Sequence, residues 1–102
     1  MDIEWIKSQI RTETYLWSLH ADEERRNDQL KVDEVTSALL NGKILEIYPR
    51  DRRGASCLIY GKSGNSPVHI VCGKNILGRL VIITVYKPRM PKWKTPTERS
   101  KT

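Results

Sequence analysis

The chain has 102 residues and a formal net charge of +6, and this length predicts a single domain. No apolar run reaches the roughly 20 residues that a membrane-spanning helix needs, and the acidic start around Asp2 and Glu4 is unlike a secretory signal. We therefore expect no membrane partner and a cytoplasmic location. Cys57 and Cys72 are too few for a disulfide framework. We expect both to be buried strand residues, with a cross-strand disulfide or a reactive thiol as alternatives.

The charge is unevenly distributed along the chain. Residues 1–48 hold six Lys and Arg against ten Asp and Glu, whereas residues 49–102 hold twelve against two. This asymmetry predicts a face on the second half that binds nucleic acid or another polyanion. The alternative is an ordinary solvated surface with a basic tail.

The chain begins with helical patterns. Ile3, Ile6 and Ile10 recur at helical spacing and Asp2 is placed to cap, which predicts an amphipathic helix over residues 2–11. The next segment, residues 13–19, fits either a helical continuation or an extended strand.

Two further helices are predicted. Ser18 is a suitable N-cap for a helix that runs to Arg26 and is acidic first and basic later, the order that the helix dipole favours. A third helix is predicted over residues 32–40. It ends at Asn41-Gly42, because glycine accepts the left-handed conformation that closes a helix.

From Lys43 onward the pattern is that of β-strands separated by short turns. The last strand is nearly continuous in β-branched and aromatic residues, which predicts a central position. Helices followed by strands predict an α+β fold, with N-terminal helices packed on a four-stranded, mainly antiparallel sheet. The predicted strands are Ile44–Tyr48, Ser56–Tyr60, Val68–Cys72 and Leu80–Tyr86.

The end of the chain is basic and rich in proline. We place the single α+β domain at residues 1–90 and a partly ordered C-terminal tail at residues 91–102. Trp93 is expected to pin this tail to the body of the domain, and the prolines argue against regular structure beyond it.

Several catalytic motifs are absent. The sequence has no GxxxxGK[ST], HExxH or paired CxxC motif, so we expect neither a P-loop nor a zinc site. Asp51 and Glu98 are the only acids after residue 48, which gives little support to a two-metal nuclease. We therefore expect no metal and no cofactor.

The two histidines are the candidate proton-transfer groups. His20 lies about a turn and a half before Arg25 and Arg26 in the predicted helix, so an imidazole and a guanidinium could share one face. His69 lies inside a predicted strand, and Tyr86 lies at the end of another. Each also has a structural interpretation: His20 as a helix-start residue bonded to backbone, His69 as a satisfied strand histidine, and Tyr86 as rim packing.

Two basic clusters, one of them with an interleaved aromatic residue, are candidate contacts to a nucleic-acid backbone, together with Arg26. An ordinary solvated turn would explain them equally well. They are Arg50, Arg52 and Arg53 in the first predicted β-turn, and Lys87, Arg89, Lys92, Trp93 and Lys94 after the last strand.

The order of short motifs resembles the bacterial domain-of-unknown-function family 4258, from about Tyr15 to Arg99. The motifs are Ser18-x-His20-Ala-Asp-Glu-Glu-Arg25, Asn41-Gly42-Lys43, Pro67-Val-His69-Ile-Val-Cys72-Gly73, Thr84-Val-Tyr86 and Pro91-Lys-Trp93-Lys94.

The resemblance implies a compact α+β domain and a small YgiT-type zinc-finger antitoxin as partner. It further implies a toxin similar to RelE- and MqsR-type mRNA endonucleases, which is a fold-level association. His20, Arg25 and His69 fall on recurrent polar positions of the family, and Tyr86 on its Thr-Val-Tyr strand end.

The leading hypothesis is thus a metal-independent ribonuclease of toxin type. His20 and His69 would act as the complementary general base and general acid, and Arg25 would bind the phosphate. Tyr86 would orient the reacting groups or stack on a base. The alternatives are a non-catalytic RNA- or protein-binding module and a purely structural partner-binding domain.

Overall fold

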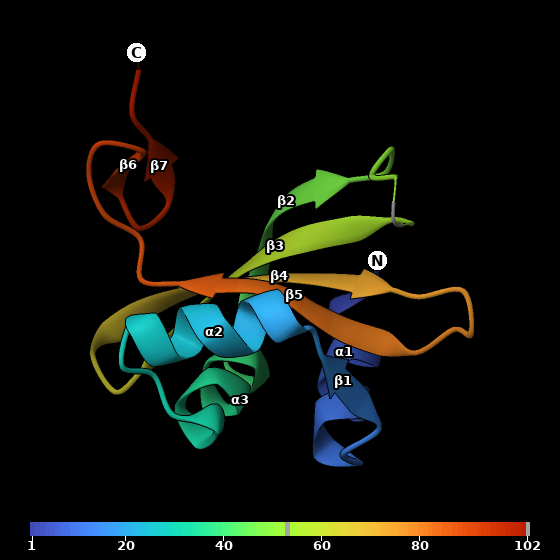
Figure 1. The fold of residues 1–102 in the computed structure, drawn as a ribbon. Helices are drawn as coiled ribbons and strands as arrows, with labels where there is room; N and C mark the ends of the chain where they lie inside the picture. Colours follow the sequence, from blue (N-terminus) through green and yellow to red (C-terminus); the bar gives the residue numbers. More distant parts are fainter. Residues whose placement is uncertain (53, 102) are drawn as a thin grey trace.

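Three helices lie on one face of a five-stranded sheet in the computed structural model, which describes residues 1–52 and 54–101 (Figure 1). The α+β class is as predicted. The helices are α1 (Ile3–Arg11), α2 (Leu19–Asn27) and α3 (Val32–Leu40).

The helix boundaries follow from local capping, which the sequence predicts at Asp2 and Ser18. The Asp2 side chain accepts a hydrogen bond from the backbone of Glu4, and the Ser18 side chain accepts one from Ala21. The backbone N–H of Lys31 donates to the Glu34 carboxylate at the start of α3. Each cap satisfies a backbone donor that has no partner within its helix.

The sheet contains one strand more than predicted. Four strands form an antiparallel meander, and the fifth pairs in parallel with the last strand. The added strand comes from the ambiguous segment 13–19. It has only three residues, which is too short for an alternating pattern to show. In the sheet order β1-β5-β4-β3-β2, the strands are β1 (Tyr15–Trp17), β2 (Lys43–Tyr48), β3 (Ser56–Ser63), β4 (Ser66–Lys74) and β5 (Leu80–Tyr86).

The β3–β4 turn is tighter than the predicted strands Ser56–Tyr60 and Val68–Cys72 imply. Ser63 and Ser66 pair across the strands, so only Gly64 and Asn65 form the loop. Gly64 has φ +60°, a conformation that residues with a Cβ adopt at a cost.

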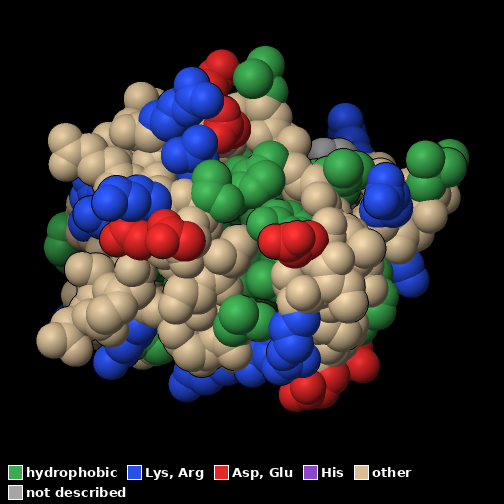
Figure 2. Space-filling view, turned by 90° about the horizontal axis from the view of Figure 1, so that it is seen from below, with side chains coloured by type: hydrophobic (Ala, Val, Ile, Leu, Met, Phe, Trp, Pro, Cys, Tyr) green, Lys and Arg blue, Asp and Glu red, His purple; other side chains and the backbone are tan. Residues whose placement is uncertain are grey.

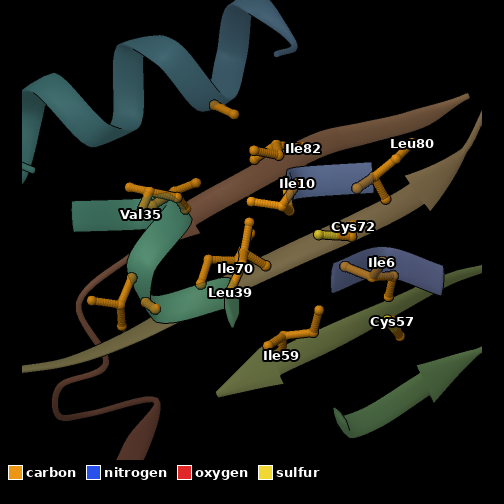
Figure 3. Close-up of a cluster of buried hydrophobic side chains, with 14 of the residues drawn as sticks. Ile6, Ile10, Val35, Leu39, Cys57, Ile59, Ile70, Cys72, Leu80 and Ile82 are labelled. Atoms are coloured by element: carbon orange, nitrogen blue, oxygen red, sulfur yellow. The ribbon is translucent and has the colours of Figure 1, made fainter. Parts of the chain in front are cut away.

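The hydrophobic core lies between the helices and the sheet face that they cover (Figure 3). Ile59 and Ile70 from the sheet pack there with Leu39 of α3. Cys57 and Cys72 are also buried in this layer, where they pair across the strands as free thiols. Burial raises the pKa of Cys57 to about 11, so the structure favours the structural interpretation over a disulfide or a reactive thiolate.

Helix α2 closes the edge of β5 beyond the point where β1 ends. The Glu24 carboxylate accepts from the backbone N–H of Val85 at 3.1 Å, and the Asp28 carboxylate accepts from that of Lys87 at 2.8 Å. Glu24 and Asp28 are four residues apart on the helix, a rise of about 6 Å, and Val85 and Lys87 are two residues apart along the strand, about 6.6 Å. The two carboxylates therefore lie opposite the two backbone N–H groups. The side chains of α2 therefore take the place of a neighbouring strand.

The chain ends in a small hairpin on the side of the sheet opposite the helices (Figure 1). It consists of β6 (Trp93–Thr95) and β7 (Glu98–Arg99), and we call residues 93–99 the C-terminal hairpin. Trp93 is only 2% exposed. The expectation of irregular chain beyond Trp93 is corrected here, because Pro91 and Pro96 lie outside the two strands. Among the described residues, no helix is long and apolar enough to cross a membrane.

Candidate functional site

His20 lies in the first turn of α2 with its side chain 64% exposed. Its Nε2 is 3.1 Å from Oε1 of Glu24, one helical turn later. The same Glu24 oxygen accepts the hydrogen bond from Val85. His20 is therefore an accessible imidazole oriented by a carboxylate that the sheet holds in place.

The predicted phosphate clamp, Arg25, is used within the fold. Its Nε and Nη2 lie 2.8 and 2.7 Å from Oδ1 of Asp22, and its Nη1 donates to the backbone oxygen of Leu30. The guanidinium also lies over the Trp17 ring, 5.6 Å from its centroid. With its side chain 17% exposed, it has little surface for a phosphate. Arg26 is exposed and pairs with Asp22 at 3.0 Å.

His69 is fully buried on the sheet face opposite the helices. Its neighbours in register are Tyr60 on β3 and Tyr86 on β5. The ring of Trp93 packs on it edge to face, with centroids 4.4 Å apart. His69 therefore has no surface available to a ligand while the C-terminal hairpin is in place.

Both ring nitrogens of His69 are hydrogen-bonded. Nε2 lies 2.6 Å from the backbone oxygen of Pro96, and Nδ1 lies 3.1 Å from the Tyr86 hydroxyl. Because a carbonyl only accepts, Nε2 carries the proton and Nδ1 accepts from Tyr86. The Tyr86 oxygen in turn accepts from the indole N–H of Trp93 at 3.1 Å. A neutral imidazole thus satisfies the whole network.

Burial lowers the pKa of His69, and the hydrogen bond to Pro96 opposes this only in part. Burial also raises the pKa of Tyr86. The structure therefore leaves the predicted His20 and His69 in different environments, one solvent-exposed and one enclosed. It does not bring the two imidazoles into one open cleft.

An ion pair that the sequence analysis missed ties the C-terminal hairpin to β2. Arg99 donates to both carboxylate oxygens of Glu46, each at 2.7 Å, and its guanidinium lies 4.6 Å from the Trp93 ring centroid. The bond to Arg99 lowers the pKa of Glu46 to about 2. Tyr48 donates to the same carboxylate. The partners are 53 residues apart, so no local pattern indicates the contact.

The cationic residues that follow β5 line a groove of about 320 Å³ between the strand end and the C-terminal hairpin. Arg89 is paired there with Asp28 at 2.9 Å, and Nζ of Lys92 lies 5.8 Å from the Tyr86 ring centroid. Lys94 is exposed on the hairpin itself. We call this the β5–hairpin groove. Its lining residues are Asp28, Tyr86, Lys87, Arg89, Met90, Pro91, Lys92 and Trp93.

The other predicted basic cluster lies at the opposite end of the sheet. Arg50 and Arg52 are exposed in the β2–β3 loop, next to the strand end where Ser56 pairs with Gly73. Arg53 lies outside the described residues. The fold thus separates two clusters that the sequence analysis grouped as one set of contacts.

The face that the helices form has no excess of one charge. Figure 2 shows Lys and Arg side chains interspersed there with Asp and Glu around apolar groups. In the described part of the chain, no group of three or more His, Cys, Asp or Glu side chains is arranged to hold a metal ion. The β5–hairpin groove combines several cations with two aromatic rings, whereas a second pocket among the described residues combines one lysine, Lys74, with Trp5.

Comparison with known proteins gives one match. Residues 17–87 match the family described as "Domain of unknown function (DUF4258)". No curated protein and no solved structure matches the chain. The matched segment contains His20, His69 and Tyr86 and ends before the C-terminal hairpin. The chain therefore belongs to the DUF4258 family, as its motifs within residues 17–87 indicate, whereas the Pro91-Lys-Trp93-Lys94 motif lies beyond the match.

Proposed function

We propose that the chain is an RNA-binding domain whose phosphate contacts lie along the β5–hairpin groove. The observation that carries the proposal is the gathering of cations beside aromatic rings at one end of the sheet. Among the described residues, Lys87, Lys92 and Lys94 form no ion pair, so their charges are free to meet phosphates. Half-buried Tyr86 lies in the same groove.

The mixture of groups favours a single-stranded nucleic acid. Lysines bind backbone phosphates without reading sequence, and aromatic faces stack on unpaired bases. Asp28 lies in the same groove, where it pairs with Arg89 and fixes the guanidinium in place. An RNA target agrees with the cytoplasmic location that we propose for the protein.

The first prediction concerns salt. Changing Lys87 and Lys92 together to glutamine should weaken binding to single-stranded RNA and flatten its salt dependence. Removal of one lysine–phosphate interaction lowers the slope of log K against log salt by about 0.7. Fluorescence anisotropy with a labelled oligonucleotide at several NaCl concentrations measures this slope.

A matched control separates the groove from net charge. The pair Arg50→Gln and Arg79→Gln removes the same charge at the opposite end of the sheet, and we expect it to weaken binding less. Equal losses in the two double variants would show that the groove is not the contact surface.

A second candidate function is metal-independent RNA cleavage of toxin type. The specific observation is the exposed His20 imidazole, held 3.1 Å from Glu24. A carboxylate-oriented imidazole can take the proton of a 2′-hydroxyl as it attacks the adjacent phosphorus, and the 5′-oxygen then leaves with a proton from water, which gives a 2′,3′-cyclic phosphate. In this proposal His20 acts without His69. A small zinc-finger antitoxin-like protein would be the partner that holds the enzyme inactive.

This candidate predicts cleavage that survives chelation. Purified protein in excess EDTA should cut mRNA, and His20→Ala should lower the rate by about 10² to 10⁴, the usual contribution of a general acid or base. Binding measured by anisotropy should stay close to that of the wild type, which makes the variant its own folding control. Absence of cleavage by the wild type, or equal cleavage by both proteins, would refute the nuclease and leave the binding proposal standing.

A further inference from the structure

The sheet face beneath the C-terminal hairpin is polar and aromatic. Tyr60, His69 and Tyr86 lie side by side in register on three adjacent strands. Glu46 and Tyr48 lie further along β2, in register with Leu58 and Ser56 of β3, and Glu46 reaches the hairpin through Arg99. Buried polar groups need partners, and a packed apolar face would need none. This face therefore has a composition suited to binding a polar ligand as well as the C-terminal hairpin that now covers it.

The C-terminal hairpin contacts this face through few groups. Trp93 is the only buried residue of the C-terminal hairpin, and its indole meets His69 and Tyr86. Pro96 contributes one carbonyl, and Arg99 contributes an ion pair with Glu46 whose partners are partly exposed. A partly exposed ion pair stabilises such a contact modestly, so its loss should increase opening of the hairpin without unfolding the domain.

The hairpin is also separate from the main core. The buried cluster between helices and sheet contains no residue of the hairpin. Detachment of the hairpin would thus expose the polar row without opening the core.

The groups that now occupy the polar row have the chemistry of a nucleobase. Trp93 offers a planar ring with an N–H donor at its edge, and that donor meets the Tyr86 oxygen. A carbonyl oxygen, that of Pro96, accepts the proton of His69 Nε2. A base has the same three features: a flat π-face, ring or exocyclic N–H donors, and carbonyl acceptors.

We infer that the row formed by Tyr60, His69 and Tyr86 is a binding site for one unpaired RNA base, and that Trp93 and Pro96 occupy it until the C-terminal hairpin swings away. The inference rests on the proposed RNA binding and extends it from the phosphate contacts to a base. It assigns His69 a hydrogen-bonding role toward the base carbonyl, and no role in proton transfer. The lysines before the hairpin remain in place to hold the backbone.

The test uses the full-length chain and the variant Arg99→Gln, which removes the ion pair with Glu46 and leaves every groove lysine intact. Arg79→Gln is the control, since it removes an equal charge from the far end of the sheet. The first readout needs no RNA. Modification of the histidines by diethyl pyrocarbonate, followed by mass spectrometry, should be slow at His69 and fast at exposed His20 in the wild type. Arg99→Gln should raise the His69 rate at least several-fold, and Trp93→Ala should raise it further.

The second readout is affinity for a short single-stranded RNA. Loss of a positive charge ordinarily weakens such binding, and Arg79→Gln should do so slightly. Arg99→Gln should instead bind RNA more tightly, and bound RNA should again protect its His69.

The outcomes separate the two proposals. Suppose that the wild type binds RNA and that this binding depends on the groove lysines. The base site alone would then be overturned if Arg99→Gln bound RNA more weakly, as the control does, or if bound RNA did not protect His69. Absence of RNA binding by both the wild type and Arg99→Gln would overturn the proposed function together with the base site.

Discussion

Replacement of Gly61 by alanine is expected to destabilise the fold by about 3 to 5 kcal/mol or to prevent folding altogether. A Cβ at this position would lie 1.9 Å from the backbone oxygen of Ala38 and 2.6 Å from its carbonyl carbon. Both atoms belong to the backbone of α3, so no side-chain rotation relieves the clash. Urea denaturation followed by circular dichroism measures the loss.

Gly64→Ala is the matched control for this prediction. A Cβ at Gly64 would have no atom within 4 Å, and only the φ of +60° opposes the change. We expect a cost of about 1 kcal/mol from backbone conformation alone. A similar loss in the two variants would contradict the view that α3 packs against β3 at Gly61.

His69→Ala is expected to cost about 2 to 4 kcal/mol, since it removes two hydrogen bonds of a fully buried side chain and leaves a cavity. The Tyr86 hydroxyl and the Pro96 carbonyl lose their partners, and Trp93 loses the ring against which it packs. The loss should be accompanied by faster amide hydrogen exchange in the C-terminal hairpin. His20→Ala, which removes the exposed histidine, should change neither quantity appreciably.

His69→Ala should also remove part of the pH dependence of the free energy of unfolding. Burial lowers the pKa of His69 in the folded state, so the unfolded chain binds the proton more readily. Wild-type stability should therefore fall as the pH drops below the unfolded value of about 6.5. Glu46, with its pKa at about 2, stays charged in this range and does not contribute. Parallel stability curves for wild type and His69→Ala between pH 7 and 5 would contradict this assignment.

The placement of the two histidines changes what a nuclease hypothesis requires. His69 is enclosed by Trp93, and Arg25 is bound to Asp22, so neither serves a phosphodiester in the arrangement seen. Any cleavage must depend on His20, which keeps an exposed ring and an orienting carboxylate. This is why RNA binding is the stronger proposal and cleavage the second.

The sequence alone determined the elements whose signals are local. The caps at Asp2 and Ser18 act on their own turns, and so the three helices could be predicted almost to the residue. The left-handed closure predicted at Gly42 is wrong, because the residue that caps the end of α3, Asn41, has φ −99° and Gly42 has no positive φ. The strand that ends at Tyr86 was equally clear, because its β-branched run needs no partner to be recognised. The basic character of the second half is likewise a property of composition.

Only the tertiary structure decided which groups meet. Three contacts join segments more than 20 residues apart: the pairing of Tyr15–Trp17 with β5, the ion pair of Glu46 with Arg99, and the enclosure of His69 by the C-terminal hairpin. Such contacts depend on strand register and on where the chain end docks, and neither leaves a local pattern. For the same reason the sequence predicted both histidines as candidates, and the fold alone showed that one faces solvent and the other lies beneath the C-terminal hairpin.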